Sequence, residues 1–107
     1  MSARLTSRHR RLGLDLPVTV SGRDLVGAPF TEDTHTFNVS SGGLCFESRH
    51  NLPMGCRLAL KIALPPALRA KFGGRSLYRV HAAVCRVERV TDAPSFRVGV
   101  RFLSEIA

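Results

Sequence analysis

The chain has 107 residues, which is enough for one domain with its own hydrophobic core but too few for two. Hydrophobic residues make up 44% of the sequence and charged residues 22%, a balance that excludes a disordered chain. No stretch approaches the roughly 18 apolar residues of a membrane-spanning helix, and the N-terminus lacks the apolar core of a secretion signal. We therefore expect a cytoplasmic protein without membrane insertion.

Basic residues are twice as numerous as acidic ones. Sixteen Lys and Arg against eight Asp and Glu give a formal net charge of +8, and lysine occurs only at Lys61 and Lys71. Arginine binds phosphate through two parallel hydrogen bonds and stacks on planar rings, so this composition favours an anionic partner such as a nucleotide. A codon bias that replaces Lys by Arg throughout would give the same excess. The positions of the arginines must therefore decide between the two explanations.

The cysteines and histidines indicate neither a disulfide framework nor a metal site. Cys45, Cys56 and Cys85 are odd in number and lack the CxxC spacing of zinc sites, which is typical of a reduced compartment. The four histidines are His9, His35, His50 and His81. They lie on different segments without ligand spacing, so we predict no metal. No nucleophile with its base and no carboxylate pair can be recognised, and we expect no enzyme activity and no cofactor.

The N-terminal segment, residues 1–11, is polar and rich in arginine. It contains Arg4, Arg8, Arg10 and Arg11 and has no apolar face that could be buried. Such a segment is predicted to form a flexible basic arm, because nothing offsets the entropy lost when its backbone becomes ordered. We expect a ligand to order it.

The rest of the chain shows the two-residue hydrophobic period of β-strands. From Leu14 onward, apolar and polar residues alternate, as in a strand with one buried face, and Pro17 places this strand at a sheet edge or marks its start. The predicted strands cover residues 14–21, 34–39, 44–48, 58–64, 77–90 and 96–102. A change of face near residues 85–87 indicates a β-bulge. Six antiparallel strands fit a small closed β-barrel, so the fold class is all-β.

The segments between these strands contain little that is apolar. Residues 22–33 are predicted to form a polar loop and residues 67–76 a connection, whereas residues 103–107 could start a helix that is too short to complete. The sequence thus predicts two parts, the basic arm of residues 1–11 and the barrel of residues 12–107.

The turn between the second and third predicted strands combines an amide, hydroxyls and glycines. Asn38 and Ser40 are followed by Ser41, Gly42 and Gly43. Glycine allows close backbone approach, and such a turn can point successive N–H groups at an anion. The same residues are also common in ordinary hairpin turns. It is the arginine arm, whose guanidinium groups can pair with phosphate and with the O6/N7 edge of guanine, that favours a joint ligand site.

With these two features the sequence resembles the PilZ family. The family's RxxxR motif is similar to Arg4-Leu-Thr-Ser-Arg8, and its (D/N)xSxxG motif is similar to Asn38-Val-Ser-Ser-Gly-Gly43. Further similar stretches are Leu14-Asp-Leu-Pro-Val18, Gly42-Gly-Leu-Cys-Phe46, Leu52-Pro-Met-Gly55, Leu60-Lys-Ile-Ala-Leu-Pro65 and Val98-Gly-Val-Arg-Phe102. The resemblance therefore extends over nearly the whole chain, and it implies a six-stranded PilZ-type barrel.

The position of the arginine motif differs from the family pattern. The family usually places its second motif arginine directly before the first strand, which is Arg11 here, and the first motif arginine would then fall on Ser7. Either Arg4 and Arg8 form a pair that is displaced outward, or Arg8 and Arg11 serve with one residue fewer between them. We favour Arg8 and Arg11 as the main ligand contacts, with Arg4 and Arg10 as additional ones.

The resemblance implies a receptor for the bacterial second messenger cyclic di-GMP. Asn38 and Ser40 would hydrogen-bond guanine or phosphate, Ser41 would lie beside them, and Gly42 and Gly43 would permit close approach. The arm would close over the nucleotide, and the changed surface would signal to a protein effector that the sequence does not identify.

Two other functions stay open. One is a barrel of the OB type that binds single-stranded nucleic acid, for which few aromatic side chains are available, because Phe96 and Phe102 are predicted to face the core and Phe46 follows a strand pattern. The aromatic residues without a clear assignment are Phe30, Phe37, Phe72 and Tyr78. The other is a degenerate PilZ domain that has lost its ligand and only binds proteins.

Overall fold

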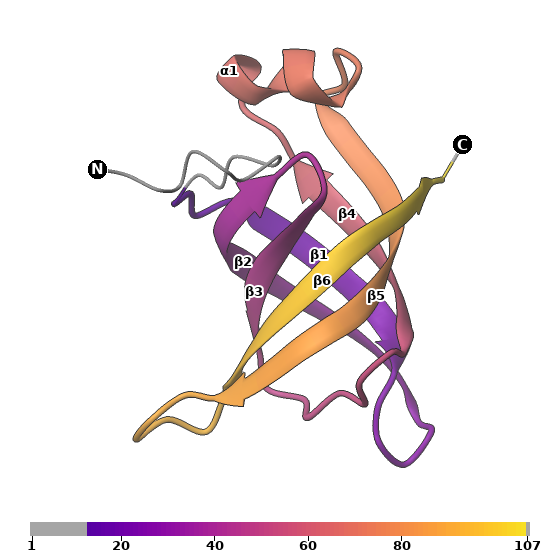
Figure 1. Cartoon of the computed structure of the whole chain (residues 1–107), viewed down its shortest axis with the longest axis vertical. Helices are drawn as coiled ribbons and strands as arrows, with labels where there is room; N and C mark the ends of the chain where they lie inside the picture. The colour runs from indigo at the N-terminus through magenta and orange to yellow at the C-terminus, as the bar shows by residue number, and fades with distance from the viewer. Residues whose placement is uncertain (1–12, 107) are drawn as a thin grey trace.

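The computed structural model describes residues 13–106, and in this part of the chain six antiparallel strands close into a barrel (Figure 1). The strands are β1 (Pro17–Arg23), β2 (Pro29–Ser40), β3 (Gly43–Ser48), β4 (Arg57–Ala63), β5 (Leu77–Arg89) and β6 (Phe96–Glu105). Around the barrel they follow the order β1-β2-β3-β6-β5-β4. The predicted all-β, six-stranded antiparallel barrel is confirmed. The basic arm, residues 1–11, lies outside the described residues.

Strand β1 begins at Pro17, three residues after the predicted start at Leu14, and Leu16 already contacts β2. The backbone N–H of Leu16 donates to the Thr36 hydroxyl at 3.0 Å, and the N–H of Thr36 donates to the carbonyl of Leu16 at 2.9 Å. Most of the predicted polar loop of residues 22–33 is strand instead. Pairing with β1 overrides its polar composition, since β2 reaches back to Pro29 opposite Arg23.

Three register shifts interrupt the sheet of the barrel, and one of them lies between His81 and Ala82 in β5. The register of β5 against β6 shifts between Val84 and Arg86, which confirms the bulge predicted near residues 85–87. The third shift, between Thr36 and Asn38 in β2, was not predicted. A bulge opposes two residues to one and increases the local twist, so each one closes the barrel and changes which side chains face outward.

A short helical segment follows β4 at one end of the barrel (Figure 1). It contains α1 (Pro66–Arg69) and the 3-10 helix η2 (Ala70–Phe72), where only a connection was predicted. Leu68 and Phe72 are buried against the core, and the Phe72 ring lies 4.9 Å from that of Tyr78. This segment closes the end of the barrel with apolar side chains.

The C-terminal residues extend β6 rather than starting a helix. Glu105 pairs with Val80 and Ser104 with His81, and the N–H of Ile106 donates to the Arg79 carbonyl at 2.8 Å. The prediction of a helical start in residues 103–107 is therefore wrong. The long partner strand β5 offers backbone hydrogen bonds along its whole length, and these outweigh the local preference.

The barrel interior holds the hydrophobic core. Its largest fully buried side chains include Phe46, Leu44, Leu58, Leu60 and Ile62.

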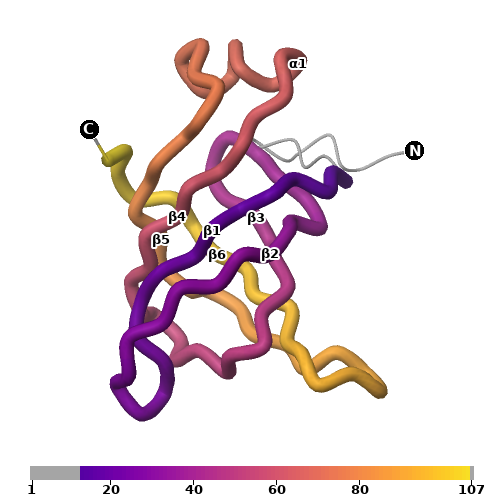
Figure 2. Tube along the Cα trace, turned by 180° about the vertical axis from the view of Figure 1, so that it is seen from behind, coloured from indigo at the N-terminus to yellow at the C-terminus, as the bar shows by residue number. Residues whose placement is uncertain are grey.

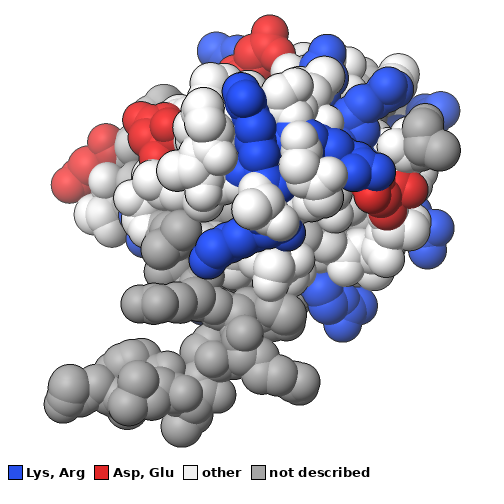
Figure 3. Space-filling view, turned by 90° about the horizontal axis from the view of Figure 1, so that it is seen from above, with Lys and Arg blue, Asp and Glu red and all other residues white. Residues whose placement is uncertain are grey.

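None of the helices in residues 13–106 is long and apolar enough to cross a membrane. Seen from the end that carries α1, blue Lys and Arg side chains are spread over the surface with few red acidic ones among them (Figure 3).

Candidate functional site

The β2–β3 hairpin tip is a compact turn held by Ser40. Ser40 and Gly43 pair across the two strands, and the turn itself consists of Ser41 and Gly42. The Ser40 hydroxyl donates to the Gly43 carbonyl and accepts from the Gly42 N–H, both at 3.2 Å, and the side chain is buried. Ser40 therefore shapes the tip from inside, whereas Ser41 is exposed beside it.

Gly43 brings the hairpin into close contact with β6. A Cβ atom on Gly43 would lie only 2.2 Å from the Val100 carbonyl oxygen and 3.3 Å from the Cα of Arg101. The Phe102 N–H donates to the Gly42 carbonyl at 2.9 Å, which fixes the tip against the same strand. The requirement for glycine at position 43 thus follows from the packing of two backbones.

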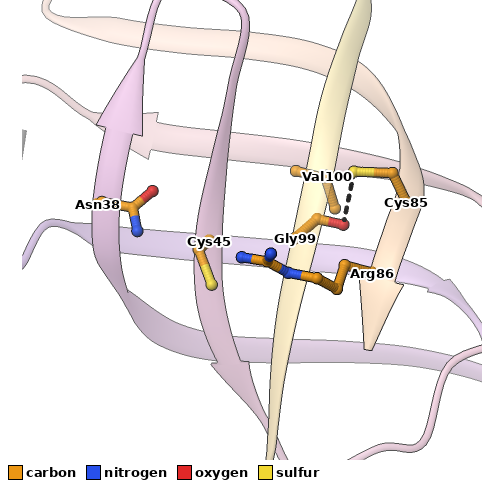
Figure 4. Close-up of a pocket in the computed structure, with 6 residues that line it drawn as sticks. All are labelled: Asn38, Cys45, Cys85, Arg86, Gly99 and Val100. Atoms are coloured by element: carbon orange, nitrogen blue, oxygen red, sulfur yellow. Dashed lines mark hydrogen bonds between the residues drawn. The ribbon is translucent and has the colours of Figure 1, made fainter. Parts of the chain in front are cut away.

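Next to this hairpin the outer face of the barrel is hollowed. A hollow of about 310 Å³ is lined by Asn38, Cys45, Cys85, Arg86, Gly99 and Val100 (Figure 4). Asn38 and Cys45 are paired on β2 and β3, and Gly99 lies between Cys45 and Arg86 in the register. Gly99 has no side chain, so the centre of this face stays open. In Figure 4 the Arg86 side chain extends across the Gly99 position toward Cys45.

The bulge in β5 places Cys85 and Arg86 at the edge of this hollow. Cys85 is the extra residue of the bulge, and its thiol donates to the Gly99 carbonyl at 3.4 Å. Cys45 is buried in the barrel wall, whereas Cys85 is exposed. The bulge thus supplies a thiol and a guanidinium group to the same rim.

Two further arginines flank the hollow on β6. Arg97 lies with its guanidinium carbon 4.5 Å from the centre of the Phe37 ring and so covers that aromatic face. Arg101 is exposed, and its cross-strand neighbours are Gly43 and Ala83, neither of which carries a charge. With Arg86, these side chains give the β2–β3–β6–β5 face a basic rim.

A hydrogen-bond network around His35 connects the residues that precede β1 with β2 and β3 at the border of this face. His35 lies between two carboxylates, with Nδ1 3.1 Å from Asp15 Oδ1 and Nε2 3.1 Å from Glu47 Oε1. Ser95 donates to Glu47 Oε2 at 2.9 Å. This hydrogen bond and the one to His35 hold the pKa of Glu47 below its usual value, against a smaller opposing effect of burial.

The structure brings part of the predicted site together. Asn38, Ser40, Ser41, Gly42 and Gly43 lie at one hairpin tip, whereas the arm residues Arg4, Arg8, Arg10 and Arg11 fall outside the described residues. Arg86, Gly99 and Arg101 were not predicted as site residues from the sequence. Gly99 and Arg101 had a readable signal, since the last strand alternates strictly and places a glycine outward between two arginines.

A family model described as the PilZ domain matches residues 5–107. The chain belongs to the PilZ family. PilZ domains are receptor or adaptor domains, and the motif residues at the hairpin tip are those through which the sequence resembles the family. No curated protein sequence matches the chain.

Solved PilZ proteins share the fold. The inhibitor of motility MotI (DgrA) from Bacillus subtilis is 18% identical, with a TM-score of 0.67 over 94% of this chain and 44% of that chain. The PilZ domain of YcgR from Escherichia coli, solved with c-di-GMP, is 18% identical, with a TM-score of 0.58 over 91% of this chain and 77% of that one. The K. pneumonia MrkH–c-di-GMP complex is 16% identical, with a TM-score of 0.61 over 91% of this chain and 44% of that one. This PilZ chain thus spans less than half the length of MotI and MrkH.

Replacement of Gly43 by alanine is expected to destabilise the barrel. The added methyl group would meet the Val100 carbonyl oxygen at 2.2 Å, so the β3 and β6 backbones must separate. We expect a loss of about 1–3 kcal/mol in the free energy of unfolding, measured by urea denaturation. Gly99→Ala is the matched control, because its Cβ would meet nothing closer than 3.5 Å. Equal losses for the two variants would contradict this account of Gly43.

Glu47 is expected to make stability depend on pH in the acid range. Its pKa is lower in the folded state than the ordinary value of 4.5, so its contribution is fully present above that value and is lost as the pH falls through the folded pKa. In urea denaturation, Glu47→Gln should therefore be less stable than the wild type near neutral pH, and the difference should shrink below pH 4.5. Glu88→Gln, at an exposed position of β5, is the control. A difference that is constant with pH would contradict the assignment.

Proposed function

We propose that this PilZ domain is a receptor for cyclic di-GMP, bound on the β2–β3–β6–β5 face beside the hairpin tip. The observation that carries the proposal is the floor of this face. Gly99 contributes no side chain to it, and Arg86 extends across the Gly99 position. A surface without a side chain at its centre can accept a guanine ring, and a guanidinium group can stack on that ring or pair with its O6/N7 edge.

The size of the hollow supports a ligand that is covered from a second side. At about 310 Å³ it lies at the small end of ligand pockets, and it is open to solvent. A nucleotide on the floor would therefore keep one side exposed. Arginines of residues 1–11 can supply the missing contacts, with Arg8 and Arg11 as the main clamps on phosphate and guanine and with Arg4 and Arg10 as additional contacts.

The hairpin residues have distinct parts in this proposal. Asn38 lines the hollow and would hydrogen-bond the ligand directly. Ser40 would act through the turn that its buried hydroxyl holds in shape, and Ser41 and Gly42 would present the tip to a phosphate. Among the relatives, the YcgR and MrkH structures named above are complexes with c-di-GMP.

Single-strand nucleic acid binding is less well supported. Bases stack on exposed aromatic rings, but Arg97 covers the Phe37 ring on this face. A PilZ domain that has lost its ligand and only binds protein stays a distinct alternative. In both alternatives, the cyclic di-GMP receptor and the ligand-free domain, a protein effector would bind to the surface of the barrel.

The purified protein is expected to bind cyclic di-GMP in preference to GTP and to a short single-stranded oligonucleotide in parallel calorimetric titrations. Gly99→Leu should weaken this binding at least tenfold, because the new side chain would fill the floor. Ala63→Leu places the same side chain at an exposed strand position of the opposite face and should leave the affinity unchanged. Tighter binding of the oligonucleotide would support the nucleic-acid alternative, and no binding of any of the three would support the ligand-free domain.

The arginine register can be decided by single substitutions. Arg8→Ala and Arg11→Ala should each weaken the binding of cyclic di-GMP by about 1.5–3 kcal/mol, the range for a hydrogen bond to a charged group. Arg57→Ala, on the opposite face, serves as the control for the loss of one positive charge. If Arg4→Ala and Arg8→Ala reduce the affinity but Arg11→Ala does not, the outer pair is the motif.

A further inference from the structure

Strands β1 and β4 lie on the side of the barrel opposite the proposed nucleotide site (Figure 2). Shallow hollows line the outer face of these strands, and we call this surface the groove. Two neighbouring hollows of about 200 and 320 Å³ lie along β1, and Thr19 and Lys61 line both of them. The outward positions of the groove on β1 and β4 carry small side chains, including Thr19, Ser21, Ala59 and Ala63. Small residues in the middle of neighbouring strands leave room for an extended chain to lie on the sheet.

Two cations line the groove. Lys61 and Arg79 are exposed and lie directly opposite each other on β4 and β5. Like charges in this arrangement are destabilising, and within residues 13–106 neither side chain forms an ion pair. Arg23 and Arg57 are exposed near one end of the same face. An anionic partner would relieve this repulsion.

The only carboxylate that lines the groove in the described part of the chain belongs to Asp33. It accepts a hydrogen bond from the Thr19 hydroxyl at 2.8 Å and lies on β2, across β1 from the two central cations. The charge at the centre of the groove therefore stays positive.

At the end of β1 the groove meets an apolar loop with a fixed shape. Leu25 is 56% exposed and Val26 is 86% exposed. The Asp24 carboxylate accepts hydrogen bonds from the N–H groups of Val26 and Ala28, each at 3.0 Å. Arg23 donates to the Gly27 carbonyl at 2.9 Å. Side chains that are held exposed in a preorganised loop lose little entropy when they are buried against a partner.

We propose that this groove binds an acidic, extended polypeptide segment of a partner protein, with an apolar side chain of that segment packed against Leu25 and Val26. Carboxylates of the segment pair with Lys61 and Arg79. Because the groove and the proposed nucleotide site lie on opposite sides of the barrel, both can be occupied at once.

Other anionic partners fit this face less well. The outward positions of β1 and β4 carry no Phe or Tyr, so the groove offers no stacking platform for a single nucleic-acid strand. A membrane surface would require a broad apolar face with aromatic residues at its border, but the apolar loop at Leu25 and Val26 is small and the hollow along β1 is lined by the hydroxyl groups of Thr19, Ser21 and Thr31. The net charge of +8 opposes the association of two copies of the chain.

The test is a titration of the full chain, followed by amide chemical shifts, with an eight-residue capped peptide of six Asp or Glu and two Leu. Shifts should map to β1, β4 and the loop of residues 24–28. The double variant Lys61→Gln, Arg79→Gln should weaken the peptide at least tenfold. Lys71→Gln, Arg89→Gln removes the same charge from η2 and from the end of β5 and should leave the affinity unchanged.

The apolar part of the proposal has its own comparison. Replacing the two peptide leucines by alanine should weaken the binding of the peptide to the wild-type protein. The same replacement should not weaken its binding to the double variant Leu25→Ser, Val26→Ser. The groove proposal is overturned if an oligothymidine of eight nucleotides binds this face as tightly as the peptide does. It is also overturned if a peptide with Asn and Gln in place of Asp and Glu binds equally well. Chemical-shift changes that are absent, or that map to the β3–β6 face, would overturn it as well. Because the groove variants leave the nucleotide face unchanged, cyclic di-GMP titrations of the same proteins report separately on the proposed receptor function.

Discussion

The close approach of Gly43 to the Val100 carbonyl is the contact on which the hairpin tip and the proposed ligand site depend. It lets β3 lie against β6 without an intervening side chain, and the Ser40 hydroxyl then closes the turn directly above this contact. With the tip fixed in this way, Asn38 and Cys45 face the same outer surface as Gly99. The serine and glycine motif therefore has a structural role in addition to the ligand contacts proposed for it.

The bulge in β5 gives the same face its charge. In a regular strand, residues alternate between core and solvent, so consecutive positions cannot both reach the outer surface. The extra residue at Cys85 interrupts this alternation and leaves Cys85 and Arg86 both exposed at the rim. A floor without a central side chain and a flanking guanidinium group thus arise from two departures from regular strand structure, a glycine and a bulge.

A closed barrel separates the two functional surfaces proposed for this domain. The nucleotide face is centred on β3 and β6 and the basic groove on β1 and β4, whereas β2 and β5 contribute residues to both surfaces. In the described part of the chain each strand pairs with a neighbour on both sides, so we expect a partner to bind through side chains on the outer faces rather than by adding a strand to the sheet. An adaptor of this kind can hold a ligand and a protein segment on opposite sides of one small core.

The sequence by itself determined the strands with strict alternation, the six-stranded barrel, the bulge near Cys85, the hairpin motif and the family. Each of these can be predicted from residues that are close in the sequence, through a hydrophobic period of two residues or a short motif. Strand pairing determined where the other strands begin and end, because β2 and β6 extend as far as their partners offer hydrogen bonds. Most of the predicted polar loop of residues 22–33 is therefore strand, and the predicted helical start in residues 103–107 is the end of β6. Only the tertiary structure placed Arg86 and Gly99 beside Asn38, and Lys61 opposite Arg79, since these residues come from different strands and meet through the register of the closed sheet.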